Sequence, residues 1–263
     1  MNVPCPNTHA EALAAPVDLP RWATGVVTLD AALNGGFVRG RVHEVYATDS
    51  EDAGGTVGFA VLLASGLAGQ GEGAKPLVWL HERRAVQVCG IMQAEGLAEL
   101  GGLPHNCLLV QAEDRKALLR ASLDAARHAG LGAVIIQGQG SMPELDLTAS
   151  RRLSLAAQRS GVTLLVLRIG AEPVPSAAET RWAANSAPSQ ALPGNATGLP
   201  TFDIELLRQR SGPSGMRWRL EWDRDRSQFR DTAIPGAVVP VPLGRPAADS
   251  GAGSLRPIAN RAA

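Results

Sequence analysis

Lysine is nearly absent from this chain of 263 residues. Lys75 and Lys116 are the two lysines, and the other 23 of the 25 basic residues are arginines. The 25 acidic residues bring the formal net charge to zero. This balance argues against a protein whose whole surface binds nucleic acid, but it leaves room for a local basic patch.

Long hydrophobic runs, paired cysteines and clustered histidines are also missing. No run approaches the roughly 18–20 apolar residues of a membrane span, and the first 20 residues lack the basic and apolar parts of a secretory signal. The three cysteines form no C-x-x-C pair and the five histidines are scattered, so we predict neither a disulfide framework nor a metal site. We expect a cytoplasmic protein with no membrane segment and no cofactor.

Short apolar runs alternate with helical patterns through the middle of the chain. We expect strands at 41–46, 77–80, 107–111, 133–137 and 162–168, and helices at 56–68, 84–94, 114–129 and 147–159. The runs are apolar throughout, which is typical of a parallel sheet with helices on both faces. Two further runs, 202–210 and 216–223, flank a turn rich in Gly and Ser and predict an antiparallel hairpin.

These patterns predict one α/β domain with loose ends. Residues 1–20 are rich in Pro and Ala and are expected to form a flexible arm. The domain is expected to span 21–230, with an irregular loop over 171–200. Residues 231–263 hold several Pro and Gly without periodicity and are expected to be a disordered tail.

The segment 24–46, TGVVTLDAALNGGFVRGRVHEVY, resembles the start of the RecA-type ATPase core. That resemblance implies a phosphate-binding loop of the form G-x-x-x-x-G-K-[ST] directly after the first core strand. Here Ala47 replaces the first glycine and Gly55 stands where the lysine belongs, while Gly54 and Thr56 match. Three carboxylates, at 49, 51 and 52, lie where the triphosphate would be, and close like charges cost about 1–4 kcal/mol each near a surface.

The second metal-binding element of the RecA core is missing as well. The strand at 134–136 should end in Asp, but Gln137 follows. Glu82 matches the position of the family's catalytic glutamate, although by itself it is better interpreted as a solvated carboxylate at a helix start. We therefore predict a RecA-like core that is not an enzyme, with no catalytic residue and only a vestige of the cofactor site.

Four further segments resemble the ImuA family of short RecA-like proteins: 145–153, 162–168, 179–182 and 205–223. The resemblance spans about residues 22–230. It implies an accessory role in SOS-induced, error-prone translesion DNA synthesis, with nucleoid association during DNA damage. Implied partners are a Y-family polymerase-like protein and an error-prone replicative-type polymerase, with RecA and single-stranded DNA as further candidates. The alternatives are a DNA-dependent ATPase or recombinase, and a RecA-like cell-division inhibitor.

Two segments are candidate surfaces for DNA or a partner. Arg181 and Trp182 pair a charge with an aromatic ring inside the expected loop, where they are either a contact or strand residues that anchor the loop. The hairpin carries Arg208, Arg210 and, on alternate positions of its second strand, Arg217 and Arg219, which are candidates for phosphate contacts. The simpler interpretation of that alternation places Trp218 and Trp222 in the core and the charges in solvent.

Overall fold

The computed structural model describes residues 19–47, 51–69, 71–102 and 104–232. The predicted arm lies outside the described residues except for its last two residues. The predicted tail also lies outside them, except for its first two. Positions 48–50 of the degenerate phosphate loop, including the acidic residue at 49, are outside the described part as well.

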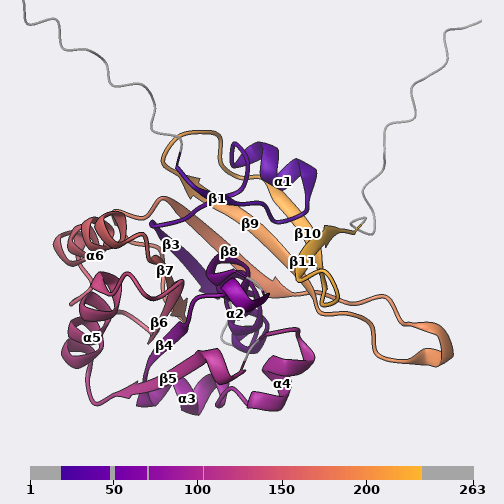
Figure 1. The fold of residues 1–263 in the computed structure, drawn as a ribbon, viewed down its shortest axis with the longest axis horizontal. Helices are drawn as coiled ribbons and strands as arrows, with labels where there is room; N and C mark the ends of the chain where they lie inside the picture. The colour runs from indigo at the N-terminus through magenta and orange to yellow at the C-terminus, as the bar shows by residue number, and fades with distance from the viewer. Residues whose placement is uncertain (1–18, 48–50, 70, 103, 233–263) are drawn as a thin grey trace, which may run out of the picture. The chain divides into compact units, whose positions relative to one another are not determined.

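A nine-stranded sheet is the centre of the domain, in the order β11-β10-β9-β8-β3-β7-β6-β4-β5 (Figure 1). Six neighbouring strands are parallel: β3 (Val42–Ala47), β4 (Leu77–Glu82), β5 (Cys107–Ala112), β6 (Ala133–Gln139), β7 (Thr163–Ile169) and β8 (Thr180–Ser186). The antiparallel part consists of β9 (Thr201–Gln209), β10 (Arg217–Asp223) and β11 (Gln228–Asp231). The predicted α/β class with a C-terminal antiparallel hairpin is confirmed. The sequence did not predict β11, and it indicated β8 only as an alternative at Arg181 and Trp182.

Helices cover both faces of the parallel strands. On one face lie α2 (Ala53–Ala68), α4 (Ala94–Glu99) and, over the antiparallel strands, α1 (Val27–Ala32) with the small sheet of β1 (Arg21–Trp22) and β2 (Phe37–Val38). On the other face α5 (Arg115–Arg127) and α6 (Leu147–Ser160) pack side by side (Figure 1). Short 3-10 turns stand at Gly71–Gly73, Pro104–Asn106 and Pro193–Asn195. Within the described ranges, no helix combines the length and apolar character needed to traverse a bilayer.

The helix predicted over 84–94 ends early, as α3 (Arg83–Cys89), and α4 begins only at Ala94, the last residue of the predicted range. Gly90 ends α3 with a φ of 73°, a conformation that other residues rarely adopt. The apolar pattern continued across this break, so periodicity alone did not reveal it.

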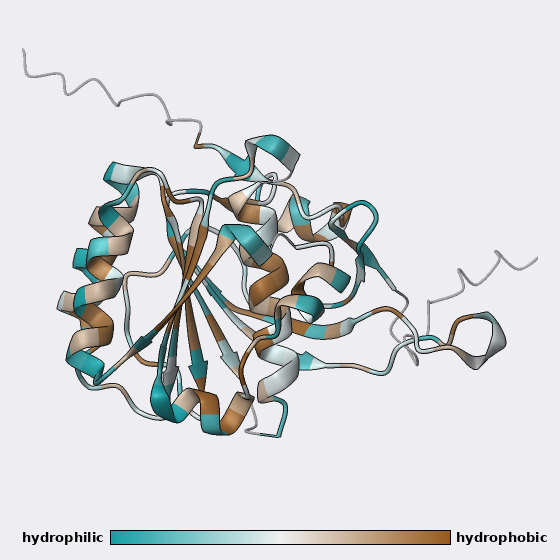
Figure 2. Ribbon diagram, turned by 60° about the horizontal axis from the view of Figure 1, so that its bottom comes forward, coloured by the Kyte–Doolittle hydropathy of each residue, from teal (hydrophilic) through white to brown (hydrophobic). Residues whose placement is uncertain are grey.

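Two hydrophobic clusters lie on the two faces of the sheet and explain the continuously apolar strands. In β6, Ile135 belongs to the α2 cluster and Val134 and Ile136 to the α5–α6 cluster, and all three are fully buried. Figure 2 shows the central strands as hydrophobic along most of their length, with polar turns on the helices outside them. The sheet is therefore the shared wall of two cores.

The Thr-Gly and Leu-Asp pairs of the 24–46 segment have a structural role. The Asp30 carboxylate accepts hydrogen bonds from the Thr24 N–H and hydroxyl, both at 2.8 Å, and from the Gly25 N–H at 3.2 Å. These bonds fix the turn that starts α1, in which Gly25 has a φ of 95°. The motif thus organises the approach to β3.

Candidate functional site

The degenerate phosphate loop joins β3 to α2 at the carboxyl edge of the parallel strands. Ala47 is the buried last residue of β3. Helix α2 begins at Ala53, three residues earlier than predicted, so Gly54, Gly55 and Thr56 belong to its first turn. Asp52 occupies the N-cap position. In a phosphate-binding loop these are the positions that would face the ligand.

The end of β8 packs against that first turn of α2. A Cβ added at Gly55 would lie 2.8 Å from both the backbone nitrogen and the Cβ of Ser186. The Thr56 hydroxyl, which would hold Mg²⁺ in a working site, donates to the Ala184 carbonyl oxygen at 2.5 Å. The Ser186 hydroxyl donates to the Asp52 carboxylate at 2.6 Å. These residues do not fit a nucleoside triphosphate, because strand and carboxylate occupy the side where the missing lysine would act.

Position 137, where the RecA core would have an aspartate, is also buried. Gln137 in β6 is buried, and its Oε1 accepts a hydrogen bond from the Trp79 indole N–H of β4 at 2.8 Å. A neutral amide satisfies a buried indole without carrying a charge. The arrangement serves packing between neighbouring strands.

Glu82 stands at the start of α3, as the simpler interpretation predicted, but it is buried rather than solvated. It ends β4, and its carboxylate accepts hydrogen bonds from the Arg115 Nε at 3.3 Å and the Gln139 N–H at 3.1 Å. Arg115 also donates to the carbonyl oxygens of Gln139 and Ser141. The carboxylate therefore links the ends of β4 and β6 to the start of α5.

Arg181 and Trp182 are buried strand residues, so the anchoring role is confirmed and the role as contacts in an irregular loop is wrong. Both belong to β8, which crosses the predicted 171–200 loop and pairs with β3. The Arg181 Nε donates to the buried Glu44 carboxylate at 2.7 Å. Trp182 is fully buried, with its ring centroid 5.3 Å from that of Phe37. Neither side chain is available to DNA or a partner.

The hairpin places its two kinds of residue on opposite faces. Trp218 and Trp222 are buried, as the simpler interpretation predicted. Across the strands, Arg217 pairs with Glu205 at 2.8 Å and Arg219 pairs with Asp203 through two bonds of 2.7 and 2.5 Å. Hydrogen bonding to Asp203 raises the pKa of Arg219.

Arg208 and Arg210 are exposed near the end of β9. Arg208 donates to the Ala178 carbonyl oxygen at 3.3 Å. Since Arg217 and Arg219 already have carboxylate partners, the four candidate arginines do not form a cluster of unpaired charges.

A second basic surface, outside the hairpin, lies on α5 and α6. These helices carry seven basic residues and one acid, Asp124, in a chain of zero net charge. Six of the basic side chains are exposed: Lys116, Arg120, Arg127, Arg151, Arg152 and Arg159. We call this set the α5–α6 basic face. Counting charges helix by helix in the sequence reveals it, because the basic residues are spread over two helices rather than gathered in one run.

The seam between α5 and α6 is hollowed and partly apolar. Two hollows of about 340 and 590 Å³ lie along it, sharing Leu123 and Arg152 in their walls. Leu155, which is 52% exposed, lines the larger hollow. The basic face therefore combines positive charge with pockets for apolar side chains.

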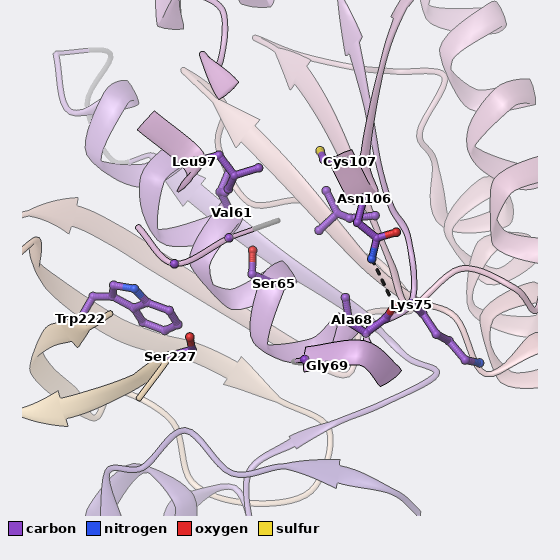
Figure 3. A pocket seen from close by; sticks show the side chains of 15 residues that line it. Val61, Ser65, Ala68, Gly69, Lys75, Leu97, Asn106, Cys107, Trp222 and Ser227 are labelled. Carbon is purple, nitrogen blue, oxygen red and sulfur yellow. Dashed lines mark hydrogen bonds between the residues drawn. The ribbon is translucent and has the colours of Figure 1, made fainter. Parts of the chain in front are cut away.

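Another pocket lies at the far end of α2 from the phosphate loop (Figure 3). It has a volume of about 220 Å³, and Val61, Leu97 and Trp222 form part of its apolar wall. The ammonium group of Lys75, its charged lining residue, donates to the Ala129 carbonyl oxygen. Burial raises the pKa of the Cys107 thiol to about 11, which keeps it protonated near neutral pH. The Cys107 thiol is therefore not an activated nucleophile.

Comparison with known proteins bears on the fold. No protein-family model matches the chain, and no curated protein sequence matches it. Among solved structures, the crystal structure of the RadB recombinase is similar with a TM-score of 0.53 and 15% identity, over 81% of this chain and 100% of that one. Such low identity shows the fold alone, and the chain has the RecA-like fold.

Proposed function

We propose that this chain is a non-catalytic RecA-like accessory protein of SOS-induced, error-prone translesion DNA synthesis and a member of the ImuA family. The observation that carries the non-catalytic part is the contact between β8 and the first turn of α2. The strand meets Gly55 where a lysine is needed, and the Thr56 hydroxyl is bonded to the Ala184 carbonyl. Phosphoryl transfer depends on positioned positive charge, and this loop offers carboxylates instead.

The α5–α6 basic face is the surface we assign to the polymerase partners. Its six exposed cations lie on two helices that carry one acid, Asp124. The hollows between the helices, one of which Glu144 also lines, accept apolar side chains. An acidic, partly apolar segment of the Y-family polymerase-like protein would complement both features. The hairpin offers less, because Arg217 and Arg219 already have carboxylate partners.

Nucleotide turnover is the first test. Purified protein should show no ATP hydrolysis above background, with or without single-stranded DNA, and no saturable binding of a fluorescent ATP analogue. The Glu82→Gln variant is the control for trace activity, since it removes the carboxylate at the family's catalytic position. Turnover that this variant abolishes would favour the ATPase alternative and contradict the proposal.

Partner binding is the second test. Arg120→Glu with Arg152→Glu reverses two charges on the basic face and should abolish co-purification with the Y-family polymerase-like protein. The same double variant should fail to restore damage-induced mutagenesis in cells that lack the gene. Arg224→Glu with Arg226→Glu, on the exposed β10–β11 turn, is the matched control and should retain both properties. Equal behaviour of the two variants would remove the basic face as the docking surface.

A further inference from the structure

Arg168, the penultimate residue of β7, is buried without adequate hydrogen bonding. It is 2% exposed, and its Nη2 donates to the Gly140 carbonyl oxygen at 3.3 Å. Among the described residues, its Nε and Nη1 have no hydrogen-bond acceptor. A guanidinium that is buried in this way loses the water that would otherwise satisfy its donors.

Among the described residues, no carboxylate forms an ion pair with Arg168. The Tyr46 ring lies between two guanidiniums, 5.8 Å from Arg168 and 5.6 Å from Arg181. Arg181 is already paired with Glu44, the acid buried on the same face of the sheet. Burial raises the pKa of Tyr46, so its phenol is neutral at pH 7. This cluster of four side chains therefore holds one positive charge in excess, and an unpaired buried charge is costly.

A surface hollow adjoins the unpaired guanidinium. It has a volume of about 560 Å³ and lies between the segments that follow β6 and β7, with Arg168 in its wall. Met142, Leu145 and Val174 give it a largely apolar lining, while Asp146 and Glu172 are exposed at its sides. It lies beyond the carboxyl ends of parallel strands, where ligands of open α/β sheets commonly bind.

We propose that this hollow binds a carboxylate carried on an apolar group, with the Arg168 guanidinium as its anchor. A single carboxylate supplies one negative charge and acceptors for the free Nε and Nη1, which matches the excess. The apolar lining suits an aliphatic stem. Asp146 and Glu172 would repel a phosphate or a polyanion more strongly than a monoanion.

The test follows the Nε–H signal of Arg168 by NMR in the full-length, ¹⁵N-labelled protein. Hexanoate is the probe for a free acid, and a short apolar peptide with a free C-terminal carboxylate is the probe for a partner chain. The same peptide with an amidated terminus, inorganic phosphate and a single-stranded oligonucleotide are the comparisons. We expect saturable shifts with hexanoate, the free-acid peptide or both, at least tenfold weaker binding of phosphate, and none of the amide. The tighter of the two acids identifies the source of the carboxylate.

Three variants separate anchoring from folding. Arg168→Met should abolish acid binding while leaving the melting temperature equal or higher, because it removes an unpaired buried charge. Arg168→Lys keeps the charge but loses the planar donors, and should weaken binding at least tenfold. Arg84→Met, at an exposed arginine of α3, is the control and should bind like the wild type. Acid binding that survives Arg168→Met, or a preference for phosphate or the oligonucleotide, would overturn the proposal.

If Arg168→Met does not fold, the Arg168 side chain is required for folding. The wild-type titration and Arg168→Lys then decide the matter. No shift of the Arg168 Nε–H with either acid would reject the site.

Discussion

Two adjacent glycines in the first turn of α2 provide a sharp test of how β8 closes the phosphate loop. A Cβ at Gly55 would approach the Ser186 backbone nitrogen and Cβ to 2.8 Å, whereas a Cβ at Gly54 would have no atom within 4 Å. Forcing an extra carbon into a packed site costs about 1–3 kcal/mol. In open space within a helix, Gly→Ala instead stabilises by up to about 1 kcal/mol. We therefore expect Gly55→Ala to destabilise the protein and Gly54→Ala to stabilise it slightly.

Urea unfolding followed by tryptophan fluorescence measures this difference, since Trp182, Trp218 and Trp222 are buried in the same cluster. For a domain of this size, 1 kcal/mol corresponds to a melting shift of about 2–4 °C. Gly55→Lys should be destabilised at least as much as Gly55→Ala and should still fail to bind a fluorescent ATP analogue. Equal stability of the two alanine variants, or ATP binding restored by the lysine, would refute the reasoning.

Three further predictions follow from buried and paired side chains. Burial lowers the pKa of His43 to about 4, so below about pH 6.5 the unfolded imidazole takes up a proton that the folded one does not. The contribution of His43 to stability is full above pH 6.5 and should fall by about 3 kcal/mol towards pH 4. As the pH is lowered over this range, the urea midpoint should therefore decline less in His43→Gln than in the wild type. In the same assay, Trp182→Ala should lower the free energy of unfolding by about 3–5 kcal/mol, whereas Arg208→Ala should lower it by under about 0.5 kcal/mol. Similar losses in the two variants would contradict the burial of Trp182. Arg217→Ala with Arg219→Ala should leave any affinity for single-stranded DNA and its salt dependence unchanged. If fluorescence anisotropy shows that the slope of log affinity against log salt concentration falls in magnitude by about 1.4, both arginines bind phosphates.

The types and order of the elements followed from local patterns. Continuous apolar runs such as 133–137 predicted parallel strands, and β6 is buried on both faces because α2 and α5–α6 cover it. Alternation over 216–223 predicted which side chains of β10 face the core. The prediction was less successful at 84–94 and 171–200. There, a glycine break and a strand flanked by Pro- and Ala-rich sequence gave no clear period.

The sequence by itself determined which chemical groups are missing: no lysine at position 55 and no aspartate at 137. Only the tertiary structure decided what occupies the space they leave, because Thr56 and Ala184 meet from 128 positions apart. The same holds for Arg181, whose partner Glu44 is 137 positions away, and for the unpaired charge of Arg168. In the sequence, an arginine of a solvated loop is indistinguishable from an arginine beside a buried carboxylate. Its role depends on which distant segments the sheet brings together, and a local pattern does not carry that information.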